Sequence, residues 1–170
     1  MKNYGLIGKS LQHSFSKKYF ENKFYQESIK DSNYNLFELK NIEDFQSLIE
    51  STKNLIGVNV TIPYKESIIP FLDEVDARAN EIGAVNTIKI NPDTKQTKGY
   101  NTDYDGFKNS LKPFLENKHE RALILGTGGA SKSVIYVLKE LNIDYLLVSR
   151  KPKKDNEIAY SDINEYVIKH

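Results

Sequence analysis

The sequence predicts an α/β fold in two parts, an open and mostly parallel α/β domain over residues 1–102 and a smaller domain over residues 103–170. Apolar runs typical of strands alternate with segments of helical period, the pattern of parallel strands joined by crossover helices. A polar break at residues 117–121 precedes a strand, loop, helix and strand spanning about 30 residues, the length of one βαβ unit. We therefore expect residues 103–170 to form a second unit, separate from the first domain.

In the first domain the elements follow from spacing and turn residues. Tyr19, Phe20 and Phe24 recur at roughly helical spacing and predict a helix over 16–27. A β-branched run that stops at Pro63 predicts a buried strand followed by a turn. The other predicted elements are strands at 4–7, 34–39, 84–90 and 97–100, the last two forming a hairpin, and a helix over 42–49.

The second domain opens with a predicted linking helix over residues 103–115. Asp103 is its N-cap candidate, and Pro113 is expected to end or kink it. After the polar break come a strand at 122–125, a helix at 131–141 and a strand at 145–149.

Composition excludes several classes of function. The 170 residues carry a formal net charge of +1, which gives no electrostatic case for nucleic acid or a membrane surface. The chain has no Cys and three scattered His, so neither a disulfide framework nor a metal site is expected. No apolar run is long enough for a signal peptide or a transmembrane helix, and we expect a cytoplasmic protein.

Residues 126–133, GTGGASKS, form a glycine-rich loop after the apolar run ALIL and fit two phosphate-binding motifs equally closely. Both a P-loop, G-x-x-x-x-G-K-[ST], and a dinucleotide loop, G-x-G-x-x-G, expect glycine where Ser131 stands. In a P-loop that glycine lets the backbone wrap a phosphate. In a dinucleotide loop the third glycine only governs helix packing, so a small residue is better tolerated. The sequence therefore favours a dinucleotide.

The following strand indicates which dinucleotide. An NAD site places an acidic residue about 20 residues after the loop, to bind the ribose 2′-hydroxyl. A hydroxyl and two cations stand there instead, which suits the 2′-phosphate of NADP(H); a solvated basic turn is the alternative. The residues expected to bind the cofactor are Gly126, Thr127, Gly128, Gly129, Ala130, Ser149, Arg150 and Lys151.

Polar clusters in the first domain are candidates for a substrate site. Ser14 and Ser16 suit a carboxylate near a helix N-terminus, although this cluster taken alone favours a plain helix N-cap. Thr61 lies at the carboxyl end of the strand predicted over 56–62, and Lys65 follows it, at the position where ligands of open α/β sheets gather. Asn86 lies in an apolar strand and needs a hydrogen-bond partner in the protein or a ligand.

Together these clusters resemble the shikimate dehydrogenase family. The resemblance rests on motifs in the family's order over the whole chain: Ser14-Phe-Ser16, NVTIPYK at 59–65, GAVNT at 83–87, NTD at 101–103, the glycine loop at 126–130, and Ser149-Arg150. Lys17 stands where the family commonly has proline. The family's chain continues through further Rossmann strands to a C-terminal helix with a substrate-binding Gln, so we expect this sequence to cover its first part only.

The resemblance implies reversible NADPH-dependent reduction of 3-dehydroshikimate to shikimate, on the route to chorismate and the aromatic amino acids. It implies a catalytic pair, Lys65 and Asp103, with Lys65 exchanging the proton. The implied substrate-binding residues are Ser14, Ser16, Thr61, Lys65, Asn86 and Asp103. The expected partner is this small molecule, and the expected assembly is a monomer or homodimer. The alternatives are a quinate/shikimate dehydrogenase with broader substrate or NAD use, an inactive ligand-binding fragment, and a P-loop phosphotransferase.

Overall fold

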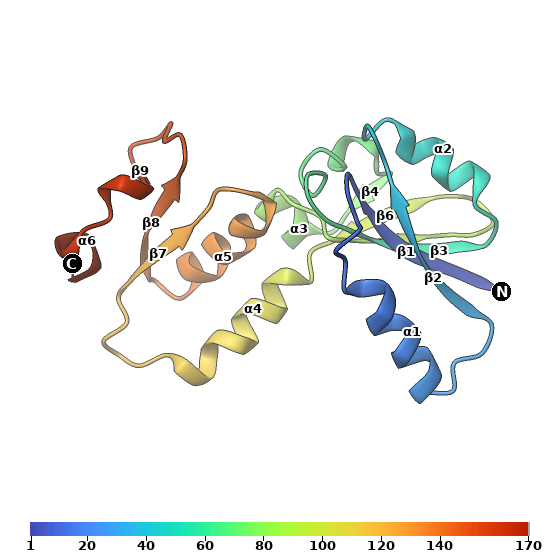
Figure 1. Cartoon of the computed structure of the whole chain (residues 1–170), viewed down its shortest axis with the longest axis horizontal. Helices are drawn as coiled ribbons and strands as arrows, with labels where there is room; N and C mark the ends of the chain where they lie inside the picture. The colour runs from blue at the N-terminus through green and yellow to red at the C-terminus, as the bar shows by residue number, and fades with distance from the viewer. Residues whose placement is uncertain (170) are drawn as a thin grey trace. The chain divides into compact units, whose positions relative to one another are not determined.

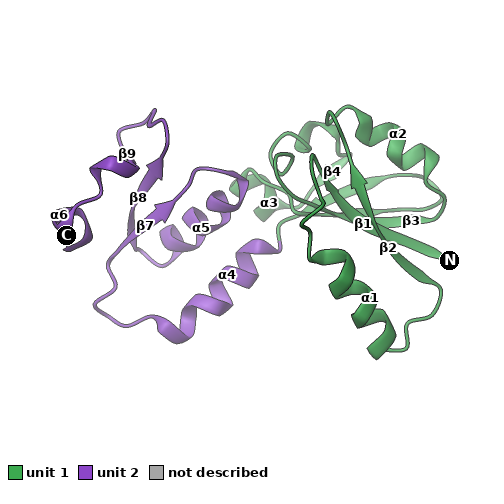
Figure 2. Ribbon diagram, in the orientation of Figure 1, with its two compact units in different colours: residues 1–101 green, residues 102–170 purple. Residues whose placement is uncertain are grey.

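The computed structural model describes residues 1–169 and divides them into two compact units (Figure 2). Unit 1 spans Met1–Asn101, and unit 2 begins at Thr102. No helix within the described residues combines the length and apolar character that crossing a bilayer requires.

Unit 1 is a mixed sheet with helices on both faces (Figure 1). The strand order is β2-β1-β3-β5-β6-β4. In chain order its elements are β1 (Lys2–Gly8), α1 (Ser16–Gln26), β2 (Ser32–Glu38), α2 (Asp44–Ser51), β3 (Leu55–Val60), β4 (Glu74–Val75), α3 (Ala77–Ile82), β5 (Thr87–Ile90) and β6 (Thr97–Tyr100).

The direction of the strands decides which loops meet. Strand β1 pairs in parallel with β2 and β3, and β4 pairs in parallel with β6. Strand β5 runs antiparallel to β3 and β6, as the predicted hairpin requires. The carboxyl ends of β1, β3 and β6 therefore lie at the same edge of the sheet as the amino end of β5.

The two faces of the sheet carry separate cores, because successive strand residues point to opposite faces. On one face, Ile7 packs in the larger cluster with Phe45 and Ile49 of α2, all at most 1% exposed. On the other, Leu6 and Tyr34 pack with aromatic residues of α1. There the Phe20 ring stacks on the Tyr34 ring at 4.3 Å between centroids.

Unit 2 is a three-stranded parallel sheet in the order β7-β8-β9 with its own small core. Its elements are α4 (Asp103–Leu111), β7 (Arg121–Leu125), α5 (Gly129–Glu140), β8 (Asp144–Ser149), β9 (Glu157–Ala159) and α6 (Glu165–Lys169). The connection β7-α5-β8 is the predicted βαβ unit. The α/β fold class is confirmed.

Several predicted boundaries are wrong, each for a local reason. Asp103 is the first residue of α4, whereas the N-cap position belongs to Thr102, so the carboxylate lies in the first turn, where it still favours the helix dipole. Strand β3 ends at Val60, because the chain turns there, and Tyr64 N–H donates to the Thr61 carbonyl (2.9 Å). Helix α4 ends before a 3₁₀ turn that contains Pro113, as expected.

Two further boundaries affect the candidate sites. Strand β5 begins at Thr87, so Asn86 precedes the ladder rather than lying in a strand. Helix α5 begins at Gly129, two residues earlier than predicted. Sequence reasoning missed β4, α3, β9 and α6 altogether.

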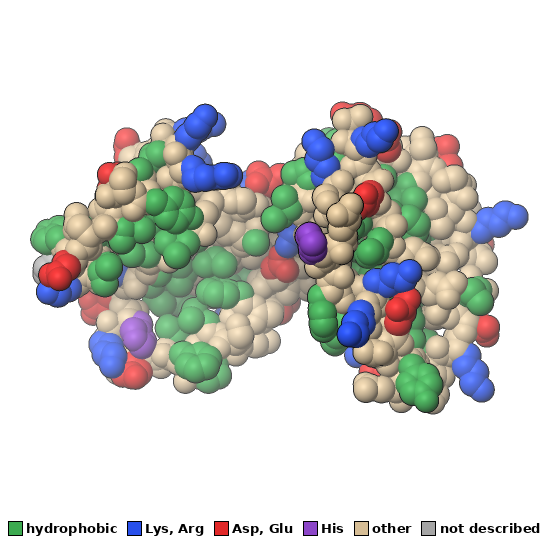
Figure 3. All heavy atoms as spheres, in the orientation of Figure 1, with side chains coloured by type: hydrophobic (Ala, Val, Ile, Leu, Met, Phe, Trp, Pro, Cys, Tyr) green, Lys and Arg blue, Asp and Glu red, His purple; other side chains and the backbone are tan. Residues whose placement is uncertain are grey.

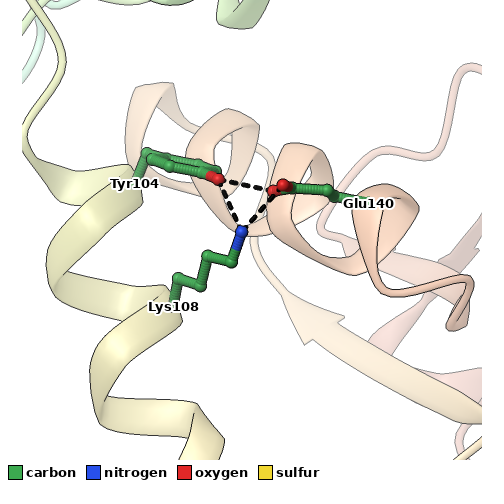
Figure 4. A network of polar contacts seen from close by, with 3 residues as sticks. All are labelled: Tyr104, Lys108 and Glu140. Carbon is green, nitrogen blue, oxygen red and sulfur yellow. Dashed lines mark hydrogen bonds and ion pairs between the residues drawn. The ribbon is translucent and has the colours of Figure 1, made fainter.

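A polar clasp joins α4 to α5 in unit 2 (Figure 4). Lys108 Nζ donates to Glu140 Oε1 (2.7 Å) and to Tyr104 Oη (2.9 Å), while Tyr104 Oη donates to Glu140 Oε2 (2.5 Å). Tyr104 is buried, at 4% exposure. The hydrogen bond to Glu140, followed by that to Tyr104, raises the pKa of Lys108 above its ordinary 10.5.

We expect Tyr104→Phe to lower the free energy of unfolding by about 1 kcal/mol, since it removes a hydrogen bond to a carboxylate that is partly solvated. Urea unfolding of the variant and the parent protein measures the difference.

Lys108→Met should also destabilise the protein. Because the folded pKa of Lys108 is raised, its contribution is fully present below pH 10.5 and is lost as the pH rises through the folded value. Urea unfolding of the parent protein and Lys108→Met from pH 8 upward should show that the difference in their free energies of unfolding shrinks as the pH rises. An exposed lysine in the same helix pair, changed as Lys139→Met, is the control and should leave stability nearly unchanged.

Candidate functional sites

The polar motifs of unit 1 converge at one edge of its sheet. Backbone hydrogen bonds tie the loops there: Thr61 N–H donates to the Ile7 carbonyl (2.9 Å), which joins the exits of β3 and β1. Val60 N–H donates to the Asn86 carbonyl (2.8 Å), and Asn86 N–H donates to the Tyr100 carbonyl (3.0 Å). The antiparallel β5 therefore brings its entry loop beside the exits of its neighbours.

Ser14, Ser16 and Thr61 line one cavity of about 630 Å³ at this edge, together with Lys9 and His13. Ser14 Oγ accepts a hydrogen bond from the Ser16 N–H (3.2 Å). The plain N-cap explanation for Ser14 is wrong, because Phe15 holds the N-cap position of α1 and no side chain of the described residues caps the helix. The accepting Ser14 hydroxyl still has a proton to donate to a ligand. Sequence reasoning missed Lys9 and His13 as lining residues.

Lys65 is half-buried in the turn after β3, and that turn is anchored through the Tyr64 side chain and the Lys65 carbonyl. The buried Tyr64 donates its phenol hydrogen to the Leu39 carbonyl (2.7 Å). The Lys65 carbonyl accepts from Val85 N–H (2.7 Å), which ties this turn to the segment carrying Asn86. The fold thus holds the backbone of Lys65 next to the backbone of the Asn86 segment.

Asn86 is 8% exposed, and its Oδ1 accepts a hydrogen bond from Thr87 Oγ1 (3.1 Å). The neighbouring turn is fixed by Asn101, which is 7% exposed and whose Nδ2 donates to the Ala84 carbonyl (2.9 Å). Asp103 starts α4 in unit 2, whereas Lys65 belongs to unit 1. Their pairing stays a prediction.

The glycine loop of unit 2 joins β7 to the N-terminus of α5. Gly126 has φ +113°, a conformation that side-chain-bearing residues rarely adopt. A Cβ at Gly126 or Gly128 would meet no atom within 4 Å, so the space over the loop backbone is open. Gly129 and Ala130 form the first turn of α5, where helix N–H groups are available to an anion. The donor set fits a pyrophosphate.

The same geometry argues against a P-loop. A P-loop wraps its phosphate with the residues between the first glycine and the lysine. Here α5 already begins at Gly129, so Lys132 lies inside the helix. Ser131 Oγ donates to the Gly128 carbonyl (2.6 Å), which ties this side chain to the loop backbone. The loop therefore has the short form of a dinucleotide loop.

The cationic residues predicted to bind the 2′-phosphate lie at the same sheet edge as the glycine loop. Strands β7 and β8 are parallel neighbours, and Gly126 N–H donates to the Val148 carbonyl (2.9 Å). Ser149 is nearly buried, and its Oγ accepts from Lys151 N–H (3.2 Å). Arg150 and Lys151 are exposed. Elsewhere, positive and negative side chains are interspersed over the face drawn in Figure 3, and the described residues hold no cluster suited to a metal ion.

Comparisons with known proteins show the family to which the chain is similar. Residues 6–88 match the family model of the shikimate dehydrogenase substrate binding domain. The NADP(+) shikimate dehydrogenase of Clostridium botulinum strain Hall is 42% identical over 154 residues, 88% of this chain and 58% of that protein.

Solved structures are similar as well. The crystal structure of shikimate dehydrogenase 1 from Peptoclostridium difficile has a TM-score of 0.82 and 37% identity over 95% of this chain and 62% of that one. The Thermus thermophilus enzyme in complex with NADP(H) and shikimate has a TM-score of 0.74 and 28% identity over 89% and 57%. This chain thus spans about three fifths of the length of these relatives. With the polar motifs at one edge of its first sheet and a dinucleotide-type loop in its second, the chain belongs to the shikimate dehydrogenase family.

Proposed function

We propose that this chain carries the substrate site and part of the cofactor site of an NADP-dependent shikimate dehydrogenase, which reversibly reduces 3-dehydroshikimate to shikimate. The observation that carries the proposal is the cavity lined by Ser14, Ser16 and Thr61, at the sheet edge that also holds the Lys65 and Asn86 segments. The family membership and the names of the relatives support it.

In this proposal the hydroxyls of Ser14 and Ser16 bind the substrate carboxylate, beside the N-terminus of α1. The ring oxygens of the substrate bind to Thr61, Lys65, Asn86 and Asp103. The bound nicotinamide supplies the hydride that reduces the C3 carbonyl carbon. Lys65 donates a proton to the carbonyl oxygen and takes it back in the reverse direction, and Asp103 holds the lysine in place.

The cofactor would bind unit 2 at the edge formed by the glycine loop and the exit of β8. The N–H groups of residues 126–130 would donate hydrogen bonds to the pyrophosphate, and the positive end of the α5 dipole favours its negative charge. The 2′-phosphate would bind to Arg150, Lys151 and the Ser149 hydroxyl. We place the protein in the cytoplasm, as a monomer or a homodimer. Size-exclusion chromatography with light scattering distinguishes the two oligomeric states.

Calorimetric titration of the chain with shikimate tests the substrate site. We expect saturable binding that weakens in Ser14→Ala and Ser16→Ala, whereas Ser47→Ala, at an exposed serine of α2 outside this cavity, leaves binding unchanged. Quinate should bind more weakly. A preference for quinate, together with turnover of NAD at the rate of NADP, would instead favour a quinate/shikimate dehydrogenase. Absence of shikimate binding at millimolar concentration would count against the proposal, and binding without any turnover would support a ligand-binding role.

A further inference from the structure

A series of side-chain hydrogen bonds crosses the α1 face of the unit 1 sheet and joins Tyr34, which lies in no motif, to Asn59 and Thr87 of two motifs. Tyr34 Oη on β2 donates to Asn59 Oδ1 on β3 (2.8 Å). Asn59 Nδ2 donates to Thr87 Oγ1 on β5 (3.3 Å), and Thr87 Oγ1 donates to Asn86 Oδ1 (3.1 Å). These hydrogen bonds therefore run from the buried Tyr34 to Asn86, a residue of the proposed substrate site.

Strand pairing explains how these residues meet. Asn59 and Thr87 are directly opposite each other in the antiparallel pair β3 and β5, where Cβ atoms are about 5 Å apart. Strand β1 lies between β2 and β3, so the Tyr34 side chain reaches across one strand to Asn59. Tyr34 is long enough to do so, and Phe20 of α1 stacks on its ring.

The burial of Tyr34 fixes which atom donates and which accepts in each of these hydrogen bonds. Tyr34 is 3% exposed, and burial raises the pKa of its phenol to about 12. The phenol is therefore a neutral donor at any ordinary pH. Because it donates to Asn59 Oδ1, the Asn59 amide must turn its Nδ2 toward Thr87. Thr87 then has its hydrogen available for Asn86 Oδ1, which fixes the orientation of the Asn86 amide.

We propose that Tyr34 and Thr87 are positioning residues that hold the Asn86 side chain in a fixed orientation through Asn59, so that its amide is set to meet a ring oxygen of the substrate. This inference rests on the proposed function, because it assigns a ligand contact to Asn86. Neither Tyr34 nor Thr87 needs to touch the ligand, and both act through Asn86.

The test is a double-mutant cycle on the shikimate affinity of the chain, measured by calorimetry. Tyr34→Phe and Thr87→Val each remove one link while keeping nearly the same shape, and each should weaken binding about tenfold. Because both act through Asn59, the double variant should lose little more than either single variant rather than about a hundredfold. Thr87→Ser keeps the hydroxyl and should restore affinity. Tyr25→Phe, at a tyrosine that is 87% exposed, is the control and should bind as the parent chain does.

Two measurements separate positioning from a general loss of structure. Thermal unfolding followed by circular dichroism reports whether each variant folds, and NADP(H) binding to unit 2 should be unchanged in all of them. Shikimate affinities equal to the parent's in folded Tyr34→Phe and Thr87→Val, or losses that simply add, would overturn the inference while leaving the proposed function standing. Failure of the parent chain to bind shikimate would overturn the proposed function and this inference with it.

Discussion

If the proposed function holds, Lys65→Ala in the full-length enzyme should lower kcat for shikimate oxidation by about 10²- to 10⁴-fold, the range that a general acid–base group contributes. The turn that carries Lys65 is held by Tyr64 and by the hydrogen bond from Val85 to the Lys65 carbonyl, and neither depends on the lysine side chain. The substitution should therefore remove the proton donor without moving the segment that carries Asn86. The measurement is steady-state turnover of shikimate with NADP, alongside calorimetric binding of shikimate.

The split between kcat and KM decides what Lys65 does. With a catalytic role, shikimate affinity changes much less than kcat. A large rise in KM at normal kcat would make Lys65 a binding residue instead. Lys89→Ala is a suitable control, because Lys89 is an exposed lysine on β5. Its removal should change neither constant.

Arg150→Ala should weaken NADP(H) binding by about ten- to a hundredfold, since a charge-assisted hydrogen bond to phosphate is worth more than a neutral one. NAD(H) lacks the 2′-phosphate, so its affinity should hardly change, and the preference between the two dinucleotides should collapse. The measurement is the dissociation constant of each cofactor by fluorescence or calorimetry at fixed ionic strength, because exposed charges are screened by salt.

Lys154→Ala is the matched control for Arg150→Ala, because Lys154 is an exposed cation in the segment after β8. We expect it to leave the preference for NADP(H) intact. Equal weakening by both substitutions would point to a general electrostatic attraction rather than a 2′-phosphate contact. Equal loss of NAD(H) and NADP(H) affinity in Arg150→Ala would place the arginine elsewhere on the cofactor.

The second unit was largely predictable from sequence, because its signals are local. A β-branched or aliphatic run, a glycine loop and an amphipathic helix each occupy a short continuous stretch, and β7, α5 and β8 follow them. The errors arose where one residue type suits two positions. Asp103 fits an N-cap and a first helical turn equally well, and Gly129 fits a loop until the helix is seen to begin there.

The first unit shows what one sequence leaves out. Ser14, Ser16 and Thr61 were predictable as motif residues, and the cavity brings them together. The hydrogen-bonded chain through Tyr34 was not, since it depends on the register of β3 against β5 and on which strand lies beside β2. Register depends on contacts between residues distant in sequence, so no local pattern around Tyr34 signals its partner.

The reversal of β5 also determines where the protein can be labelled. Because β5 and β6 form a hairpin, the turn at residues 91–96 lies at the end of the sheet opposite to the loops that carry Thr61, Asn86 and Asn101. A fluorophore or an affinity tag inserted in that turn would stay a strand's length away from those loops. Such a reporter would allow ligand binding to be followed in an unmodified pocket.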